Sequence, residues 1–202
     1  HAQRNFIEKG LTAANDNDII LISDVDEIPN LEGKDIKNLN NKIILFEQTI
    51  FYYKLNRYLP NFTWYGTKAC KKKHLENPQW LRSIKNKKYP FFRLDTLFSK
   101  SKYIDKHYIK NGGWHFSNLK TSNDIEIKLK SYLHHRDYES EELGIEKIKK
   151  LIKENKTIYD MYGDKGSKKY GDNSRKKLEK FELDKLPLYI QNNLEKFKEW
   201  ID

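Results

Sequence analysis

The hydrophobic pattern of the first forty residues predicts a helix, a buried strand and a second helix. Apolar residues recur at helical spacing through residues 3–14. The run Ile19–Ile22 is too short for a stable helix and is apolar on both faces, which is typical of a buried parallel strand in an α/β sheet. Pro29 favours the first turn of a helix, which we expect to continue to about Leu39.

The middle of the chain reads as strands joined by loops and one short helix. Between Lys42 and Leu55, β-branched and aromatic residues predict one or two strands. Further along, we expect a loop at 56–62, a strand at 63–70, a short helix at 77–84, an extended aromatic-rich stretch at 89–98 and a turn at 111–113.

The last third of the chain has a helical pattern. Asn123 is placed to cap a helix over 123–134, with Glu126 three residues later, and further helices are expected at 140–154 and 186–201. A polar, glycine-containing loop is expected at 163–174. This change of pattern predicts an α/β catalytic domain over 1–135 and a helical extension over 136–202 that packs on it.

Composition narrows the class of protein. The chain has 202 residues, 13% of them aromatic, which indicates a packed core rather than a disordered chain. A single cysteine, Cys70, excludes a disulfide framework and a multi-cysteine zinc site. No apolar run approaches the length of about 18 residues that spans a membrane, so no membrane span is expected in this chain.

The net charge of +10 comes from one segment. Residues 67–135 hold 16 basic and 5 acidic residues, a net of +11, whereas 1–66 is net −2 and 136–202 is net +1. The lysines of 71–73 and 85–88, with aromatic neighbours, raise the alternative of a nucleic-acid-binding module. A solvated lysine-rich surface explains them as well, so a nucleic-acid partner is disfavoured.

The strongest chemical signal is the D-x-D sequence at the end of the first predicted strand. If the strand continues, Asp24 and Asp26 share a face while Val25 turns to the core, and Glu27 points away from both aspartates. Paired carboxylates at a strand end are oxygen ligands suited to Mg²⁺ or Mn²⁺. The alternative is a pair of capping residues at a strand–helix turn.

A second signal lies near residue 115. Gly112 and Gly113 would let the backbone approach a ligand closely, and Trp114 offers an apolar platform for a sugar ring or a base. His115 could complete a metal site with a neutral imidazole. Each of these residues taken alone also fits a structural role.

Five strings in order carry a family resemblance: HAQRNFIEKGL, DIILISDVDEIPN, FYYKLN, TWYGTK and NGGWHFSNL. Together they resemble glycosyltransferase family 17, which includes β-1,4-mannosyl-glycoprotein 4-β-N-acetylglucosaminyltransferases. The resemblance implies a GT-A-type fold and inverting, metal-dependent transfer of a sugar, most simply GlcNAc from UDP-GlcNAc, to a glycan or glycoconjugate hydroxyl. A catalytically inactive sugar- or nucleotide-sugar-binding domain is the further alternative.

The resemblance also implies roles for individual residues. Asp24 and Asp26 take the D-x-D role toward Mn²⁺ or Mg²⁺, His115 is the later metal ligand, and Arg4 meets the donor diphosphate. The sugar pocket would be shaped by Gly112, Gly113 and Trp114. The catalytic base is not identified by any motif; the candidates are Asp95, Asp124, Glu126, His134 and Asp137.

Two departures from the family pattern matter. The family carries strands before the first helix that are missing here, so we expect an unpaired sheet edge and no activity from residues 1–202 alone. The helix after NGGWHFS opens with Ser122 and Asn123 where the family often has Pro-Glu.

The expected cellular location depends on the source: the cytoplasm for a microbial or viral protein, the secretory lumen for a eukaryotic one.

Overall fold

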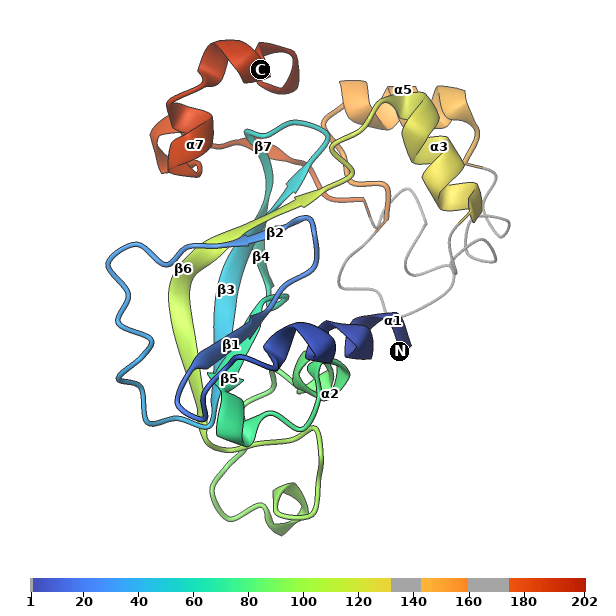
Figure 1. Ribbon diagram of the computed structural model, residues 1–202. Helices are drawn as coiled ribbons and strands as arrows, with labels where there is room; N and C mark the ends of the chain where they lie inside the picture. Colours follow the sequence, from blue (N-terminus) through green and yellow to red (C-terminus); the bar gives the residue numbers. More distant parts are fainter. Residues whose placement is uncertain (1, 132–142, 160–174) are drawn as a thin grey trace. The chain divides into compact units, whose positions relative to one another are not determined.

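The computed structural model describes residues 2–131, 143–159 and 175–202, which form two compact units (Figure 1). Unit 1 comprises His1–Thr49 and Thr63–His115, and unit 2 comprises Ile50–Phe62 and Phe116–Asp202. The described residues contain both strands and helices, so the predicted α/β class is confirmed. The functional division at residue 135 and the GT-A arrangement stay predictions.

Unit 1 is built on strands that pair side by side. They are β1 (Ile19–Ile22), β5 (Lys68–Lys71), β3 (Ile43–Tyr52), β6 (Lys106–Ser117) and β2 (Glu27–Pro29), hydrogen-bonded in that order, with β3 and β6 continuing into unit 2. The pairs β1–β5, β3–β5 and β2–β6 are antiparallel. Among the described strands, β1 therefore lies at the edge of the order, with β5 as its neighbour.

The strand predicted at 19–22 exists with those bounds, but its parallel pairing was wrong. β1 runs antiparallel to β5, with Ile20 opposite Cys70. Both faces of β1 are covered: Ile20 and Ile22 belong to one core cluster, while Ile19 and Leu21 pack against another. A run that is apolar on both faces thus reports burial on both sides, and it says nothing of the direction of the neighbouring strand.

The helices of unit 1 follow local signals. The predicted first helix is present as α1 (Ala2–Asn5), which continues as the 3₁₀ helix η1 (Phe6–Leu11). The predicted helix at 77–84 is α2 (Pro78–Ser83), and Asn77 caps it by accepting a hydrogen bond from the Trp80 backbone N–H. Two short 3₁₀ helices are η2 (Lys72–His74) and η3 (Leu94–Thr96), the latter in the stretch expected to be extended.

Several local predictions were wrong. No helix follows Pro29, because that residue ends β2 opposite Gly113 of β6. The loop expected at 56–62 is instead strand β4 (Arg57–Trp64), and the single strand expected at 63–70 is divided between the end of β4 and β5, with residues 65–67 outside both. The turn expected at 111–113 is absorbed into β6, where positive φ angles at Asn111 and Gly113 accommodate the irregular backbone within the strand.

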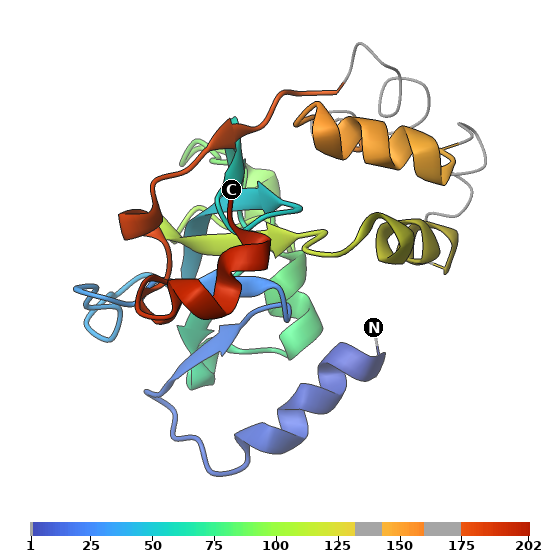
Figure 2. The ribbon, with the colours of Figure 1, turned by 90° about the horizontal axis from the view of Figure 1, so that it is seen from above.

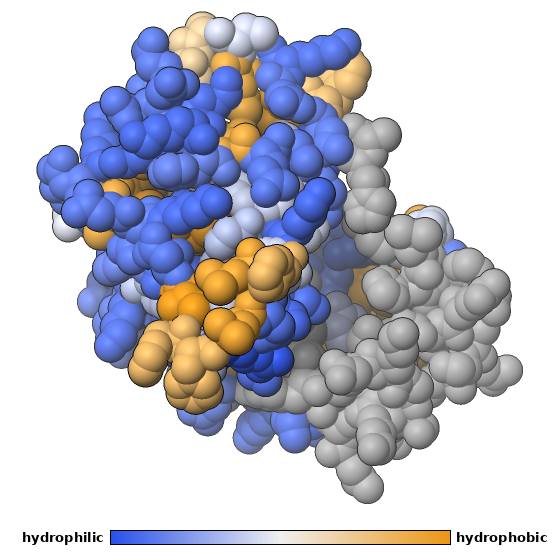
Figure 3. Space-filling model, turned by 90° about the horizontal axis from the view of Figure 1, so that it is seen from below, coloured by the Kyte–Doolittle hydropathy of each residue, from blue (hydrophilic) through white to orange (hydrophobic). Residues whose placement is uncertain are grey.

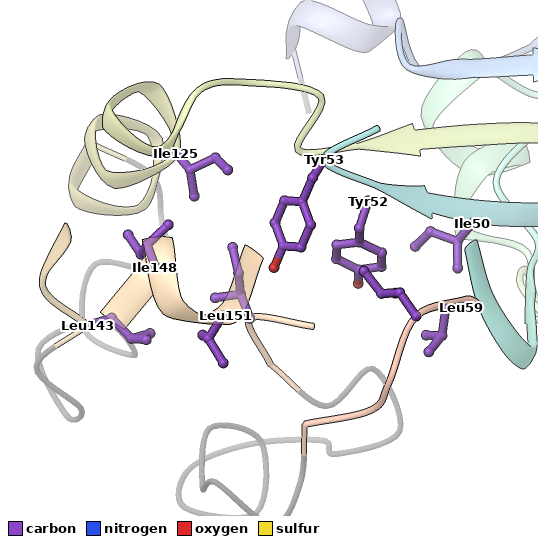
Figure 4. Close-up of a cluster of buried hydrophobic side chains, with 10 residues drawn as sticks. Ile50, Tyr52, Tyr53, Leu59, Ile125, Leu143, Ile148 and Leu151 are labelled. Carbon is purple, nitrogen blue, oxygen red and sulfur yellow. The ribbon is translucent and has the colours of Figure 1, made fainter. Parts of the chain in front are cut away.

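Unit 2 packs helices on its own hydrophobic cluster. The helices α3 (Ser122–Ser131) and α5 (Ile145–Lys153) lie side by side (Figure 2) and confirm the predicted helices within their described parts. Thr121, rather than Asn123, caps α3 by accepting from the Asp124 backbone N–H. The labelled residues of Figure 4 show the core: Ile50, Tyr52, Tyr53, Leu59, Ile125, Leu143, Ile148 and Leu151.

The end of the chain is less regular than predicted. The expected helix over 186–201 is divided into α7 (Leu188–Gln191) and the 3₁₀ helix η6 (Leu194–Trp200), after the short η5 (Leu183–Lys185). Strand β7 (Glu179–Lys180) pairs antiparallel with β4. The loop predicted at 163–174 lies outside the described residues. No helix in the described part of the chain is long and apolar enough to cross a membrane.

Candidate active site

The D-x-D residues lie in a turn between β1 and β2, not on a continuing strand. The turn is closed by the Glu27 backbone N–H, which donates to the Asp24 carbonyl at 3.0 Å, and by Ser23 Oγ, which donates to the Glu27 carbonyl at 3.1 Å. Val25 is 104% exposed, so the prediction that it faces the core was wrong. Because strand alternation stops at Ile22, the two aspartates contact different partners.

Asp24 is bound by two arginines. Its Oδ1 lies 2.9 Å from Arg4 Nη2, and its Oδ2 lies 2.5 Å from Arg82 Nη2. Arg4 is held in turn by a hydrogen bond to Gln79 Oε1 at 3.0 Å. The structure therefore places Arg4 beside the D-x-D sequence, as an ion-pair partner of its first carboxylate.

Glu27 is the buried centre of the same network. Its carboxylate accepts from Arg82 Nη1 at 3.0 Å, from Trp64 Nε1 at 2.7 Å and from the Asp24 backbone N–H at 2.9 Å. Burial acts to raise the pKa of Glu27, but the hydrogen bonds from Arg82 and Trp64 and the charge of Arg82 outweigh it, so the pKa is lower than usual. The prediction that Glu27 points away from both aspartates was therefore wrong for Asp24.

The position of Arg82 is fixed by the end of α2. Lys68 Nζ donates to the carbonyls of Arg82 and Ile84, at 2.6 Å each, where the helix exposes its last carbonyl groups. Burial, with the nearby charge of Arg82, lowers the pKa of Lys68 to about 8. Arg82 Nη1 also donates to the Gly66 carbonyl, which ties the guanidinium to the segment between β4 and β5.

Asp26 faces the histidine of the second sequence motif. Its Oδ2 lies 3.4 Å from His115 Nε2. Antiparallel pairing of β2 and β6 sets Glu27 opposite His115, and the Trp64 ring packs on the imidazole with centroids 4.7 Å apart. His115 Nδ1 is buried and has no hydrogen-bond partner within the described part of the chain.

These contacts distinguish the two aspartates as candidate metal ligands. Asp24 has both oxygens engaged by guanidinium groups, whereas Asp26 and His115 bring an oxygen and a nitrogen ligand together. No group of three or more His, Cys, Asp or Glu side chains within the described ranges could hold a metal ion. A site of two protein ligands still fits Mn²⁺ or Mg²⁺, because such ions in nucleotide enzymes complete their coordination with substrate phosphates and water.

Close packing explains why the second motif has glycine at two positions. A Cβ on Gly112 would lie 2.9 Å from the Glu47 backbone nitrogen, and one on Gly113 would lie 2.1 Å from the Ile28 carbonyl oxygen. Close strand pairing on both sides of β6 therefore requires them. Trp114 is half-buried opposite Ile28. Their roles in a sugar pocket stay predictions.

The candidate bases that the structure describes have charged or polar partners of their own. Asp95 forms ion pairs with Arg93 and Lys102 on an exposed loop of unit 1. In unit 2, Asp124 accepts a hydrogen bond from Thr121 Oγ1, and Glu126 pairs with Lys130 on the same helix. His134 and Asp137 lie outside the described residues.

Sequence reasoning missed the residues that organise the site. Glu27 was visible within the string SDVDEIP, but the predicted strand alternation turned it away. Trp64 lies in the string TWYGTK, to which no role was given, and Arg82 comes from a segment with no motif of its own; only the fold brings them to Glu27. A buried carboxylate predicts that some cation must lie near it, but not which of the chain's arginines or lysines does so.

Gly66 offers a direct test of this packing. A Cβ at this position would lie 1.8 Å from Glu27 Oε1 and 2.3 Å from Trp64 Nε1. We expect Gly66→Ala to lower the free energy of unfolding by about 1–3 kcal/mol, because the buried network must shift to admit the methyl group. Denaturant unfolding measures this. Gly10→Ala is the matched control, since nothing lies within 4 Å of its added Cβ; an equal loss in both variants would contradict the prediction.

Comparison with known proteins agrees with the motifs. A family model described as glycosyltransferase family 17 matches residues 1–201, essentially the whole chain. No curated protein and no solved structure matches the chain significantly. The match includes both segments that form the Asp24, Glu27 and His115 cluster, and the chain therefore belongs to glycosyltransferase family 17.

Proposed function

We propose that this protein is an inverting glycosyltransferase that moves GlcNAc from UDP-GlcNAc to a hydroxyl of a glycan or glycoconjugate, with Mn²⁺ or Mg²⁺ held by Asp26 and His115. The observation that carries the proposal is the Asp26–His115 pair, 3.4 Å apart, within a chain of glycosyltransferase family 17. The donor sugar, the metal and the inverting course go beyond the family assignment.

In this proposal the surrounding residues keep the pair in place. Trp64 packs on the imidazole of His115 and is fixed through its indole N–H by Glu27. When bound, the divalent cation supplies positive charge that stabilises the departing diphosphate. Arg4 and Arg82 add fixed positive charge beside the same turn, while their ion pairs with Asp24 hold the turn in shape.

The transfer also needs a base that accepts the proton of the acceptor hydroxyl. Glu27 does not suit this role. Its carboxylate is buried, and its pKa is lower than usual. It already accepts hydrogen bonds from Arg82, Trp64 and the Asp24 backbone. In the proposal Glu27 is thus a positioning residue, and the base lies elsewhere in the chain.

The proposal is tested by measuring UDP release from full-length protein with UDP-GlcNAc, UDP-GalNAc, UDP-glucose and UDP-galactose, each with a glycan acceptor. We expect UDP-GlcNAc to give the highest rate, EDTA to abolish it and added Mn²⁺ to restore it, because in the proposal the cation supplies charge that stabilises the departing diphosphate. NMR of the product should show a β-linkage formed from the α-linked donor.

Two results would contradict the proposal. Turnover that is unaffected by EDTA would contradict the proposed role of the metal. An α-linked product would contradict the proposed inversion at the anomeric carbon. Metal-dependent UDP binding without turnover toward any donor would instead favour the inactive nucleotide-sugar-binding alternative.

A further inference from the structure

Unit 1 carries a loop whose base is fixed and whose tip projects apolar side chains. We call residues 85–101 the basic-aromatic loop. Its ends are joined by the Lys85 backbone N–H, which donates to the Ser101 carbonyl at 2.7 Å. Lys106 Nζ, from β6, donates to the carbonyls of Lys85 at 2.8 Å and Lys87 at 2.6 Å. The loop is therefore held at its base as a defined structure.

The tip of the loop exposes five large apolar side chains. Phe91, Phe92, Leu94, Leu97 and Phe98 are each between 70% and 89% exposed. The loop is the lowest part of the ribbon in Figure 1, and Figure 3, seen from below, shows hydrophobic side chains gathered there and ringed by hydrophilic ones. Scattered apolar residues are normal on a protein surface, but a contiguous patch of this kind marks an interaction site.

The loop turns these side chains outward by its own hydrogen bonds. Thr96 is buried and its Oγ1 donates to the Arg93 carbonyl at 2.6 Å, within the η3 turn. Asp95 accepts from Arg93 Nε at 2.6 Å and from Lys102 Nζ at 2.9 Å, which braces the turn from outside. The small polar residue thus faces inward while the neighbouring leucines and phenylalanines face solvent.

The charges around the tip indicate which kind of partner the loop would bind. Between Lys85 and Ile104 there are six basic residues and a single acidic one, Asp95, which is already paired with Arg93 and Lys102. Lysines around a cluster of phenylalanine and leucine match the surface of an anionic bilayer, where cations meet headgroups and apolar groups enter the acyl boundary.

We propose that the basic-aromatic loop docks this protein on an anionic phospholipid bilayer, with its apolar tip inserted at the headgroup boundary. Nucleic acid fits less well, because the exposed side chains of the tip include Leu94 and Leu97, which cannot stack on bases as aromatic rings do. The docking is peripheral. It is independent of the proposed sugar transfer, so either can fail alone.

The first test is sedimentation of the purified protein with vesicles. One set is phosphatidylcholine alone, and the other contains about 30% phosphatidylserine. We expect clear binding to the anionic set and much weaker binding to the neutral set. Absence of binding to the anionic vesicles overturns the proposal.

Two variants separate the apolar and charged contributions. Phe91→Ser with Phe98→Ser should weaken binding to anionic vesicles by at least about tenfold, because each phenylalanine loses its apolar burial. Changing Lys85, Lys87 and Lys88 together to Gln should weaken it on the order of a hundredfold. The control, Phe6→Ser with Ile127→Ser, removes two apolar side chains outside the loop that are 64% and 63% exposed; equal weakening by the control overturns the assignment to the loop.

A probe at the tip tests insertion directly. Cys70 is buried and burial raises its thiol pKa to about 12, so a thiol-reactive, polarity-sensitive fluorophore will select an introduced Phe98→Cys. Anionic vesicles should shift the emission to that of an apolar environment. No shift while the protein is bound to vesicles overturns insertion, and a shift produced by a single-stranded oligonucleotide but not by vesicles overturns the choice of partner.

Discussion

Asp26→Asn is expected to reduce metal-dependent sugar transfer by at least about a hundredfold while leaving the protein folded. Asparagine keeps the shape of the side chain but removes the negative charge that, in our proposal, binds the cation beside His115. The Asp26 side chain is 38% exposed and lies in a turn. Loss of its charge should therefore leave the midpoint of thermal unfolding nearly unchanged. UDP release and calorimetry on the same preparation measure the two effects.

The matched control for this variant is Asp16→Asn, which makes the same change in an exposed turn before β1. It should retain full activity. Raising Mn²⁺ should partly rescue Asp26→Asn, because a weakened site fills at higher metal concentration. Turnover of Asp26→Asn within about threefold of the parent would show that Asp26 is not a metal ligand in the reaction.

Arg82→Met should have the largest effect on stability, lowering the free energy of unfolding by about 3–5 kcal/mol at neutral pH. The Arg82 side chain is 11% exposed and that of Glu27 only 1%, so methionine fills the space but leaves a buried carboxylate without its cation. Denaturant unfolding measures the loss. Arg93→Met removes an arginine from an exposed pair and should leave the unfolding midpoint unchanged.

The pH dependence separates a lost charge pair from poor packing. In the parent, the lowered pKa of Glu27 gives stability that is present above its unfolded pKa and is lost as pH falls through the folded value. In Arg82→Met, burial alone should raise that pKa, so the folded variant gains stability as Glu27 is protonated. The deficit should therefore shrink between pH 7 and about pH 4, and a constant deficit would contradict a charge-pair origin.

Sequence patterns predicted elements well where a local signal suffices. The apolar run at Ile19–Ile22 gave the bounds of β1, and the short helix expected at 77–84 is present as α2, which Asn77 caps. The same reasoning failed after Pro29, where pairing of β2 with β6 decides the conformation of the chain. Pairing with a strand some eighty residues away is a long-range contact, and it outweighs the local preference of proline for a helix start.

The candidate site shows the same contrast between residues that a local motif reveals and partners that only the fold brings together. The string SDVDEIP located Asp24 and Asp26, and NGGWHFS located His115, because these residues carry their chemistry in short motifs. Their partnerships were not predictable. Alternation along a strand is a valid rule only while the strand lasts, and here the chain turns after Ile22, which exposes Val25 and brings the Glu27 carboxylate back to the Asp24 backbone.

The division of the chain into two units has a consequence for how such a protein can be altered. The chain passes between the units inside β3, β4 and β6, not in linkers. Boundaries of exchangeable domains ordinarily fall in exposed linkers that few contacts cross. No single cut of this chain releases either unit whole, so neither unit can be exchanged as one continuous segment of sequence. An exchange of either unit alone would have to break all three of these strands.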